Sequence, residues 1–241
     1  MADNNNESSE FQAIDFALGA HIVKAFDGLN PNSGPKQFRE FLTRPANKKI
    51  YRYDAGTPKE FINELRSSRK SEISLETQDI LSHKIVNLPT LPVVVYFRKS
   101  GFLNNDDRGS IMQDKIVWDD NLLRSYNLTI LPVTQDYKLW FLAWDKLSLD
   151  KLQISWYAYV SKPENKRFNV LYRIGKDDFE ICAAINDPKS FMMSDISLSH
   201  DDGRMFGVET TLTIVTQILF GESVSIPDPA KVYGVCAGCY E

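Results

Sequence analysis

An alternating pattern near the end of the chain constrains the fold most. Between Met205 and Phe220, even-numbered and odd-numbered positions carry two different sets of side chains. Successive side chains of a β-strand point to opposite faces of a sheet, so this pattern predicts a strand. The two sets are Val208, Thr210, Leu212, Ile214 and Thr216, and Thr211, Thr213, Val215 and Gln217. Strands usually have about 3–10 residues, so the sequence predicts a sheet with one unusually long strand.

Shorter strands are expected upstream. The β-branched run Val93–Val95, flanked by prolines, predicts a buried strand within Leu88–Arg98, and Lys49–Tyr53 predicts another. The polar stretch Lys99–Asp114 predicts a long loop. The segments of two predicted hairpins are Tyr126–Val133 with Tyr137–Trp144, connected by Thr134, Gln135 and Asp136, and Arg167–Ile174 with Phe179–Asn186, connected by residues 175–178.

The helices are predicted from apolar spacing and capping residues. Apolar side chains at three- and four-residue steps predict a helix within Phe11–Leu29 and a short second helix around Phe38–Leu42. The stretch Thr57–Arg69 predicts a third helix, because Glu60 follows Thr57 at the spacing of a capping box. Ser148–Val160 predicts a fourth helix, with Ser148 as its cap.

The order of these elements predicts an α+β fold in which a largely antiparallel sheet packs against helices. We expect a helical N-terminal arm at residues 1–46 and an α+β core domain at residues 47–221. Residues 222–241 contain several prolines and glycines, so we expect an extended C-terminal tail without a core of its own.

Charge and segment composition exclude several functions. The formal net charge is −4 and the pI about 5.5, so no global positive field exists to hold a nucleic acid. The longest apolar stretches, such as Leu91–Phe97 and Ile214–Phe220, are far shorter than the roughly 20 residues of a membrane span. Residues 1–10 lack the basic start and apolar run of a signal peptide. We therefore expect neither a membrane nor a sequence-specific nucleic-acid partner.

The cysteines and histidines form no complete motif. Cys236 and Cys239 have the CxxC spacing used in metal ligation and thiol exchange. A structural zinc site needs four ligands, however, and the sequence has no second CxxC and no paired histidines. The remaining candidates are Cys182, His21, His83 and His200, which are scattered singly along the chain. We predict no catalytic residue and no cofactor, and whether Cys236 and Cys239 bind a metal stays open.

Two further groups of residues have both a functional and a structural interpretation. Adjacent carboxylates could bind calcium or act as acid and base, but they are expected to lie in solvated loops. These pairs are Asp106–Asp107, Asp119–Asp120, Asp177–Asp178 and Asp201–Asp202. Aromatic side chains could form a binding surface, although packing between strands and a helix uses the same residues. This set is Trp140, Phe141, Trp144, Trp156, Tyr157 and Tyr159.

The order of elements between Leu91 and Gly221 also supports a family resemblance. Leu131-Pro132-Val133 leads into Tyr137–Trp144, the capped segment Ser148–Val160 follows, and a series of strands ends at Phe220. In this order the chain resembles the tail-terminator and neck or tail-completion proteins of tailed bacteriophages. The resemblance covers about half of the chain.

This resemblance implies a non-enzymatic virion subunit, made in the host cytoplasm, that forms a symmetric ring, expected to be a hexamer. It would contact other tail or neck proteins, and the segments expected to make contacts are Phe11–Leu29, Lys99–Asp114 and the tail after Gly221. Two alternatives remain. One is an enzyme with a carboxylate-lined pocket over the sheet, and the other is a cellular adaptor that binds through its N-terminal helix.

Overall fold

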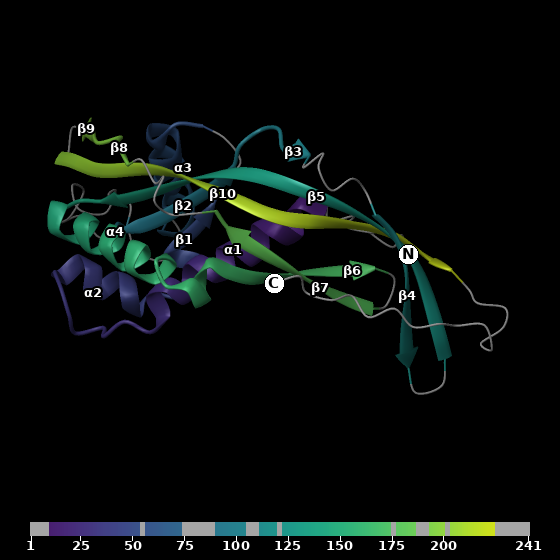
Figure 1. Cartoon of the computed structure of the whole chain (residues 1–241). Coiled ribbons are helices and arrows are strands. Elements are labelled where there is room, and N and C mark those ends of the chain that lie inside the picture. Colours follow the sequence, from purple (N-terminus) through teal and green to yellow (C-terminus); the bar gives the residue numbers. More distant parts are fainter. Residues whose placement is uncertain are drawn as a thin grey trace.

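The computed structural model describes residues 10–53, 56–73, 90–104, 111–119, 122–174, 177–186, 193–200 and 203–224. Within these ranges the chain forms helices and one large, strongly curled sheet, which confirms the predicted α+β class (Figure 1). The helices gather at one end of the molecule, and a hairpin extends at the other end. No helix in these ranges is long and apolar enough to cross a membrane.

Two long antiparallel strands form the centre of the sheet. β5 (Leu122–Ala143) and β10 (Gly203–Val224) pair continuously from Phe206↔Ala143 to Val224↔Ser125. The other strands are β1 (Ile50–Arg52), β2 (Val93–Arg98), β3 (Leu103–Asn104), β4 (Ile111–Asp119), β6 (Arg167–Ile174), β7 (Asp177–Ile185), β8 (Ser194–Asp195) and β9 (Leu198–His200). Across the sheet the order is β1-β2-β5-β10-β7-β6, and of these neighbours β1 and β2 are parallel and the rest antiparallel.

The prediction of a first hairpin at Thr134–Asp136 is wrong, because β5 continues straight through these residues. Their polar side chains have partners within the sheet. The Gln135 amide donates to the carbonyl of Lys99 at 2.9 Å, and the Asp136 carboxylate accepts from the Thr213 hydroxyl at 2.7 Å. None of the three residues is a Gly or Asn of the kind that tight hairpin turns require. Polar residues here are therefore part of the strand pairing.

The predicted loop Lys99–Asp114 is also partly wrong, because it contains β3 and the start of β4. β4 pairs antiparallel with β5 from Ile111↔Ile130 to Asp119↔Leu122. The β4–β5 hairpin thus lies upstream of the position that we expected. Residues 120 and 121 lie outside the described ranges. The composition of this stretch favours a loop, but the long partner strand extends the pairing into it.

The long last strand and the second hairpin are confirmed. In β10 the predicted face carries Thr210, Leu212, Ile214 and Thr216, all of which are buried. β6 and β7 pair up to Ile174↔Asp177. The alternation of buried and exposed residues in β6 places one of its faces in the core.

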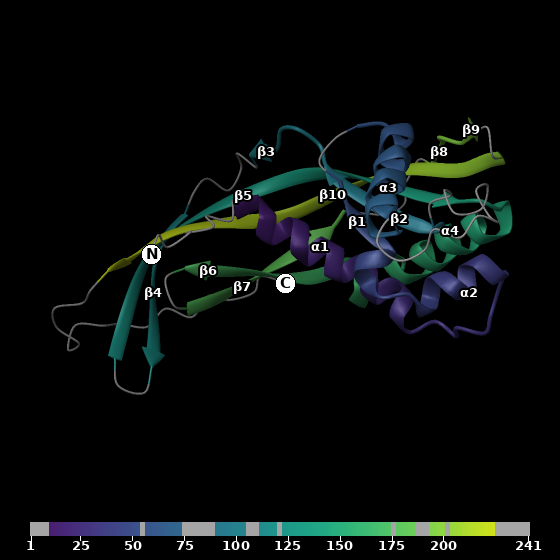
Figure 2. The same ribbon diagram turned by 180° about the vertical axis from the view of Figure 1, so that it is seen from behind.

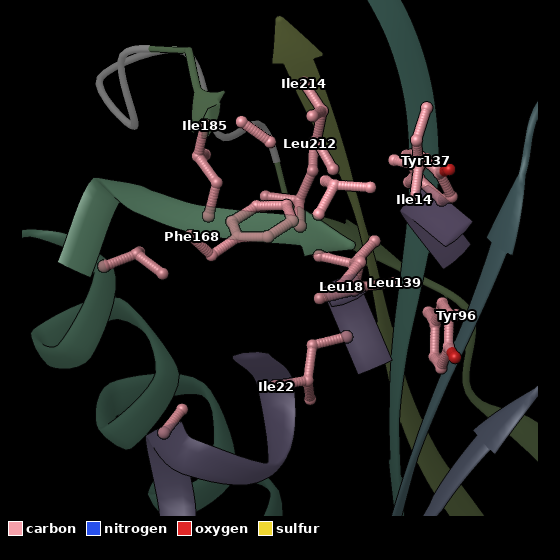
Figure 3. Packing of buried hydrophobic residues seen from close by; sticks show 14 of the residues in the cluster. Ile14, Leu18, Ile22, Tyr96, Tyr137, Leu139, Phe168, Ile185, Leu212 and Ile214 are labelled. Carbon is pink, nitrogen blue, oxygen red and sulfur yellow. The ribbon is translucent and has the colours of Figure 1, made fainter. Parts of the chain in front are cut away.

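Helices cover both faces of the sheet. α1 (Glu10–Asp27), α2 (Lys36–Thr43) and α4 (Lys146–Val160) belong to the main core, on the face that carries Leu212 and Ile214. Figure 3 shows Ile14, Leu18 and Ile22 of α1 pointing into this core. α3 (Pro58–Ile73) packs on the opposite face, where a second cluster includes Phe61, Val93, Val95 and Trp140 (Figure 2).

One predicted helix cap is confirmed and another is wrong. At α3 the Thr57 N–H donates to the Glu60 carboxylate at 2.8 Å, and the Glu60 N–H donates to the Thr57 hydroxyl at 3.3 Å, as a capping box requires. At α4 the cap is Asp145, whose carboxylate accepts from the Ser148 N–H at 2.7 Å. Ser148 is buried in the first turn of the helix. An ionised carboxylate is a stronger acceptor for these amides than a hydroxyl.

The N-terminal helices do not project from the body of the protein. The side chains of Ile14, Leu18 and Ile22 are 0 % exposed and belong to the same cluster as Leu212 and Ile214. The apolar face of α1 that we expected to contact a partner is therefore covered by this chain's own sheet. The predicted domain limits at residues 46 and 221 stay predictions, and the tail after residue 224 lies outside the described ranges.

Candidate functional site

A buried charge network joins α1 to the sheet. Asp15 lies in the first half of α1 and is 1 % exposed. Its Oδ1 accepts a hydrogen bond from the Tyr137 hydroxyl of β5 at 2.7 Å. Its Oδ2 lies 3.0 Å from Nη2 of Arg52 in β1, as an ion pair without the alignment of a hydrogen bond. Because a buried carboxylate needs such partners, these contacts tie the helix to two strands.

The phenols of the network are weak acids. Burial, and then the negative charge of Asp15, raise the pKa of Tyr96 to about 12. Burial also raises the pKa of Tyr137, and the charge of Asp15 and its hydrogen bond to the phenol raise it further. Both hydroxyls therefore stay protonated at neutral pH, and Tyr137 acts as a donor to the carboxylate. Since both oxygens of Asp15 contact partners from the sheet, the arrangement fits a structural role.

His21 is a second buried polar group on α1. Its Nε2 lies 2.8 Å from the carbonyl oxygen of Asn165, and its ring stacks on Phe168 with centroids 4.9 Å apart. Burial lowers the pKa of His21, and the hydrogen bond to Asn165 opposes this only in part. The neutral imidazole thus donates to a carbonyl at the end of the short helix Pro163–Lys166 and holds it against α1.

The described carboxylate pair, Asp177 and Asp178, forms the start of β7, opposite the end of β6. Asp177 accepts from the Tyr126 hydroxyl at 2.5 Å. Asp178 pairs with the Arg173 guanidinium at 2.8 and 3.1 Å, and these hydrogen bonds lower the pKa of Asp178. Each carboxylate therefore has a structural partner. The predicted loop at residues 175–178 is partly wrong, because Asp177 and Asp178 already pair with Ile174 and Arg173 as part of the sheet.

The other candidates cannot be assembled into a site. Asp119 and His200 belong to β4 and β9, but their side chains are not described. The candidates that lie outside the described ranges are His83, Asp106, Asp107, Asp120, Asp201, Asp202, Cys236 and Cys239. Among the side chains that are described, no three His, Cys, Asp or Glu residues gather as metal ligands would.

The solvent side of α4 carries three exposed apolar side chains. Leu147 is 68 % exposed and Ile154 is 62 % exposed, and one turn further along the helix Tyr157 is 43 % exposed. At 3.6 residues per turn, positions 147, 154 and 157 lie on the side opposite the buried Leu152 and Trp156. We call Leu147, Ile154 and Tyr157, with Asp150 and Lys151 between them, the α4 face. Single exposed apolar residues are common, but a stripe on one helix is typical of an interaction surface.

The aromatic residues singled out in the sequence include both buried and exposed side chains. Trp140, Phe141 and Trp156 are almost fully buried, which confirms the expected packing role for them. Tyr157 differs, because it is exposed on the α4 face. The sequence analysis missed this surface. A signal was present: apolar residues occur on all sides of the predicted helix 148–160, whereas a helix that packs against the core with one side needs them on that side only.

No protein-family model matches the chain, and no curated protein sequence matches it either. The geometry of the α4 face and of the buried networks is therefore the basis for a functional hypothesis.

Proposed function

We propose that this chain is a non-enzymatic structural subunit that acts by assembling with copies of itself and with neighbouring proteins. Following the resemblance in element order, we propose the tail or neck of a tailed bacteriophage as the assembly, with the subunits in a ring. The observation that carries the proposal is the α4 face, with Leu147 and Ile154 both more than half exposed. Covering such residues with another protein removes apolar surface from water and therefore favours association.

The free energy available from the α4 face suits reversible assembly. Fully burying one large apolar side chain contributes about 1.5–3 kcal/mol. Leu147, Ile154 and Tyr157 are already partly buried, so six such side chains from two copies supply roughly 6–10 kcal/mol. Association costs an estimated 4–15 kcal/mol in lost freedom of motion. These amounts are comparable, so we expect assembly that depends on protein concentration.

The extended shape of the sheet also supports a role in assembly. The β4–β5 hairpin extends away from the helical end of the molecule (Figure 1). Between Ile130 and Ser125, β5 pairs with β4 on one side and with β10 on the other, so among the described residues only the end of the hairpin at Leu122–Arg124 has two strands. Two-stranded ribbons are marginally stable in water and gain stability when another chain packs on them. The end of the hairpin is therefore the second surface that we propose for a neighbouring subunit.

The alternative of an adaptor that binds through its N-terminal helix is less well supported. The apolar residues of α1 are buried under the chain's own sheet, and the charge network of Asp15 and the hydrogen bond of His21 hold the helix there. Release of α1 would leave the Asp15 carboxylate without Tyr137 and Arg52. The enzyme alternative has no described group of converging carboxylates in its favour.

The experiment is light scattering coupled to size-exclusion chromatography of the full chain, from low to high micromolar concentration. The wild-type chain should elute at a mass above the 27.5 kDa of one chain, with a fraction that rises with concentration. The double variant Leu147→Ser/Ile154→Ser should shift toward 27.5 kDa. Phe16→Ser is the matched control, because Phe16 is 64 % exposed and belongs to another helix, α1. A wild-type chain that stays a monomer even with its neighbouring proteins would refute the proposal.

A further inference from the structure

The α4 face carries two adjacent side chains of opposite charge. Asp150 and Lys151 are adjacent, and they lie between Leu147 and Ile154. Neither charge forms an ion pair with any side chain in the described part of the protein. The centre of the stripe therefore offers one negative and one positive group, each free for another molecule, with an apolar residue on either side.

Positions on this face repeat at the spacing of a helix–helix contact. Leu147, Asp150, Ile154 and Tyr157 follow one another at steps of three, four and three residues, which places them along one seam of the helix. A two-fold axis that passes between Asp150 and Lys151 reverses the helix direction. It brings Leu147 of one copy opposite Ile154 of the other, and Asp150 opposite Lys151, in both halves of the contact.

We propose that the occupant of the α4 face is α4 of a second copy of this chain, packed antiparallel in that register. The contact is self-complementary, as a two-fold interface requires: each copy gives the same apolar pairs and the same two ion pairs. This inference rests on the proposed function as a self-assembling subunit and names the partner for one of its surfaces. The two-fold contact joins two chains and adds to the contacts that would close a ring.

Other arrangements of two α4 helices use the charges less well. Parallel packing in register places Asp150 against Asp150 and Lys151 against Lys151, so like charges repel. An antiparallel register centred on Ile154 leaves Asp150 opposite Ala158 and Lys151 opposite Tyr157, and both charges lose water without gaining a partner. The register centred between Asp150 and Lys151 pairs both charges of the α4 face and places Leu147 opposite Ile154 twice. Tyr157 then lies at the edge of the contact, opposite position 144, which precedes α4.

The test uses two charge reversals in the full chain, Asp150→Lys and Lys151→Asp. Each variant alone places like charges opposite each other twice in the two-fold contact, so its self-association should weaken by at least about tenfold. Mixed in equal amounts, the two variants restore both ion pairs, because lysines of one chain face aspartates of the other. We expect the mixture, measured by sedimentation velocity, to associate about as well as the wild-type chain. Circular dichroism melting of each variant checks that the fold is intact.

The outcomes separate this inference from the proposed function. If the wild-type chain does not associate alone or with its neighbouring proteins, the proposed function fails. If the wild-type chain associates but both single variants associate equally well, the α4 register is wrong while the proposed function stands. The register is also wrong if the single variants are weakened and their mixture is not restored. Only one result supports the antiparallel pair: weakened self-association of each variant, with association recovered when the two variants are mixed.

Discussion

Removing one hydroxyl group from Tyr137 should destabilise the protein measurably. The hydroxyl donates to Oδ1 of Asp15 at 2.7 Å, at a carboxyl group that is 1 % exposed. A hydrogen bond to a charged group contributes about 1.5–3 kcal/mol, and water cannot replace it at a buried site. Tyr137→Phe should therefore lower the free energy of unfolding by about 2–3 kcal/mol. For a chain of this size that corresponds to a melting temperature lower by about 5–10 °C.

The assay is urea unfolding followed by circular dichroism, at a protein concentration where the chain is monomeric. A lower midpoint with an unchanged slope would show that stability has changed and not the denatured state. Tyr157→Phe is the matched control, because it removes the same atom from an exposed ring with no hydroxyl partner in the described ranges. It should change the free energy by less than about 0.5 kcal/mol. A loss of less than about 0.5 kcal/mol for Tyr137→Phe would refute the role given to the charge network.

The remaining predictions concern close packing, protonation and capping. Gly19→Ala should cost about 1–3 kcal/mol, because a Cβ there would overlap the Tyr96 hydroxyl, whereas Gly28→Ala has free space and should be nearly neutral in thermal melts. Burial lowers the pKa of His21 from 6.5, so the unfolded chain binds the proton more readily than the folded chain. The free energy of unfolding should therefore fall as the pH drops below about 6.5. His21→Gln should make the free energy of unfolding less dependent on pH in this range. Asp145→Ala should cost about 1 kcal/mol in denaturant unfolding through loss of the α4 cap.

Local sequence patterns predicted the elements that are specified by residues close together in the chain. The alternation in β10, the spacing in α1 and the capping box at Thr57 each specify an element by short-range rules. The central strand β5 shows where such rules fail. Thr134, Gln135 and Asp136 resemble a turn in composition, but their partners, Lys99 and Thr213, lie on other segments of the chain. Those contacts exist only after the sheet forms, so no local pattern contains them.

The candidate surfaces show the same limit. The apolar stripe of α1 was visible in the sequence, but its use as an interface depended on whether the sheet covers it, and the sheet does. The α4 face was overlooked because Leu147 and Ile154 occur among the apolar residues that form the core. The sequence shows that α4 is apolar on more than one side, and only the packing of the helix shows which side is left exposed.

The most direct measurement of the central claim is hydroxyl-radical footprinting of the wild-type chain at low and high concentration. If the α4 face is an assembly surface, oxidation of Leu147, Ile154 and Tyr157 should fall as the assembled fraction rises, while Phe16 on α1 stays equally reactive. Equal reactivity of the three side chains at high concentration and in the dilute monomer would show that the α4 face is not an assembly surface.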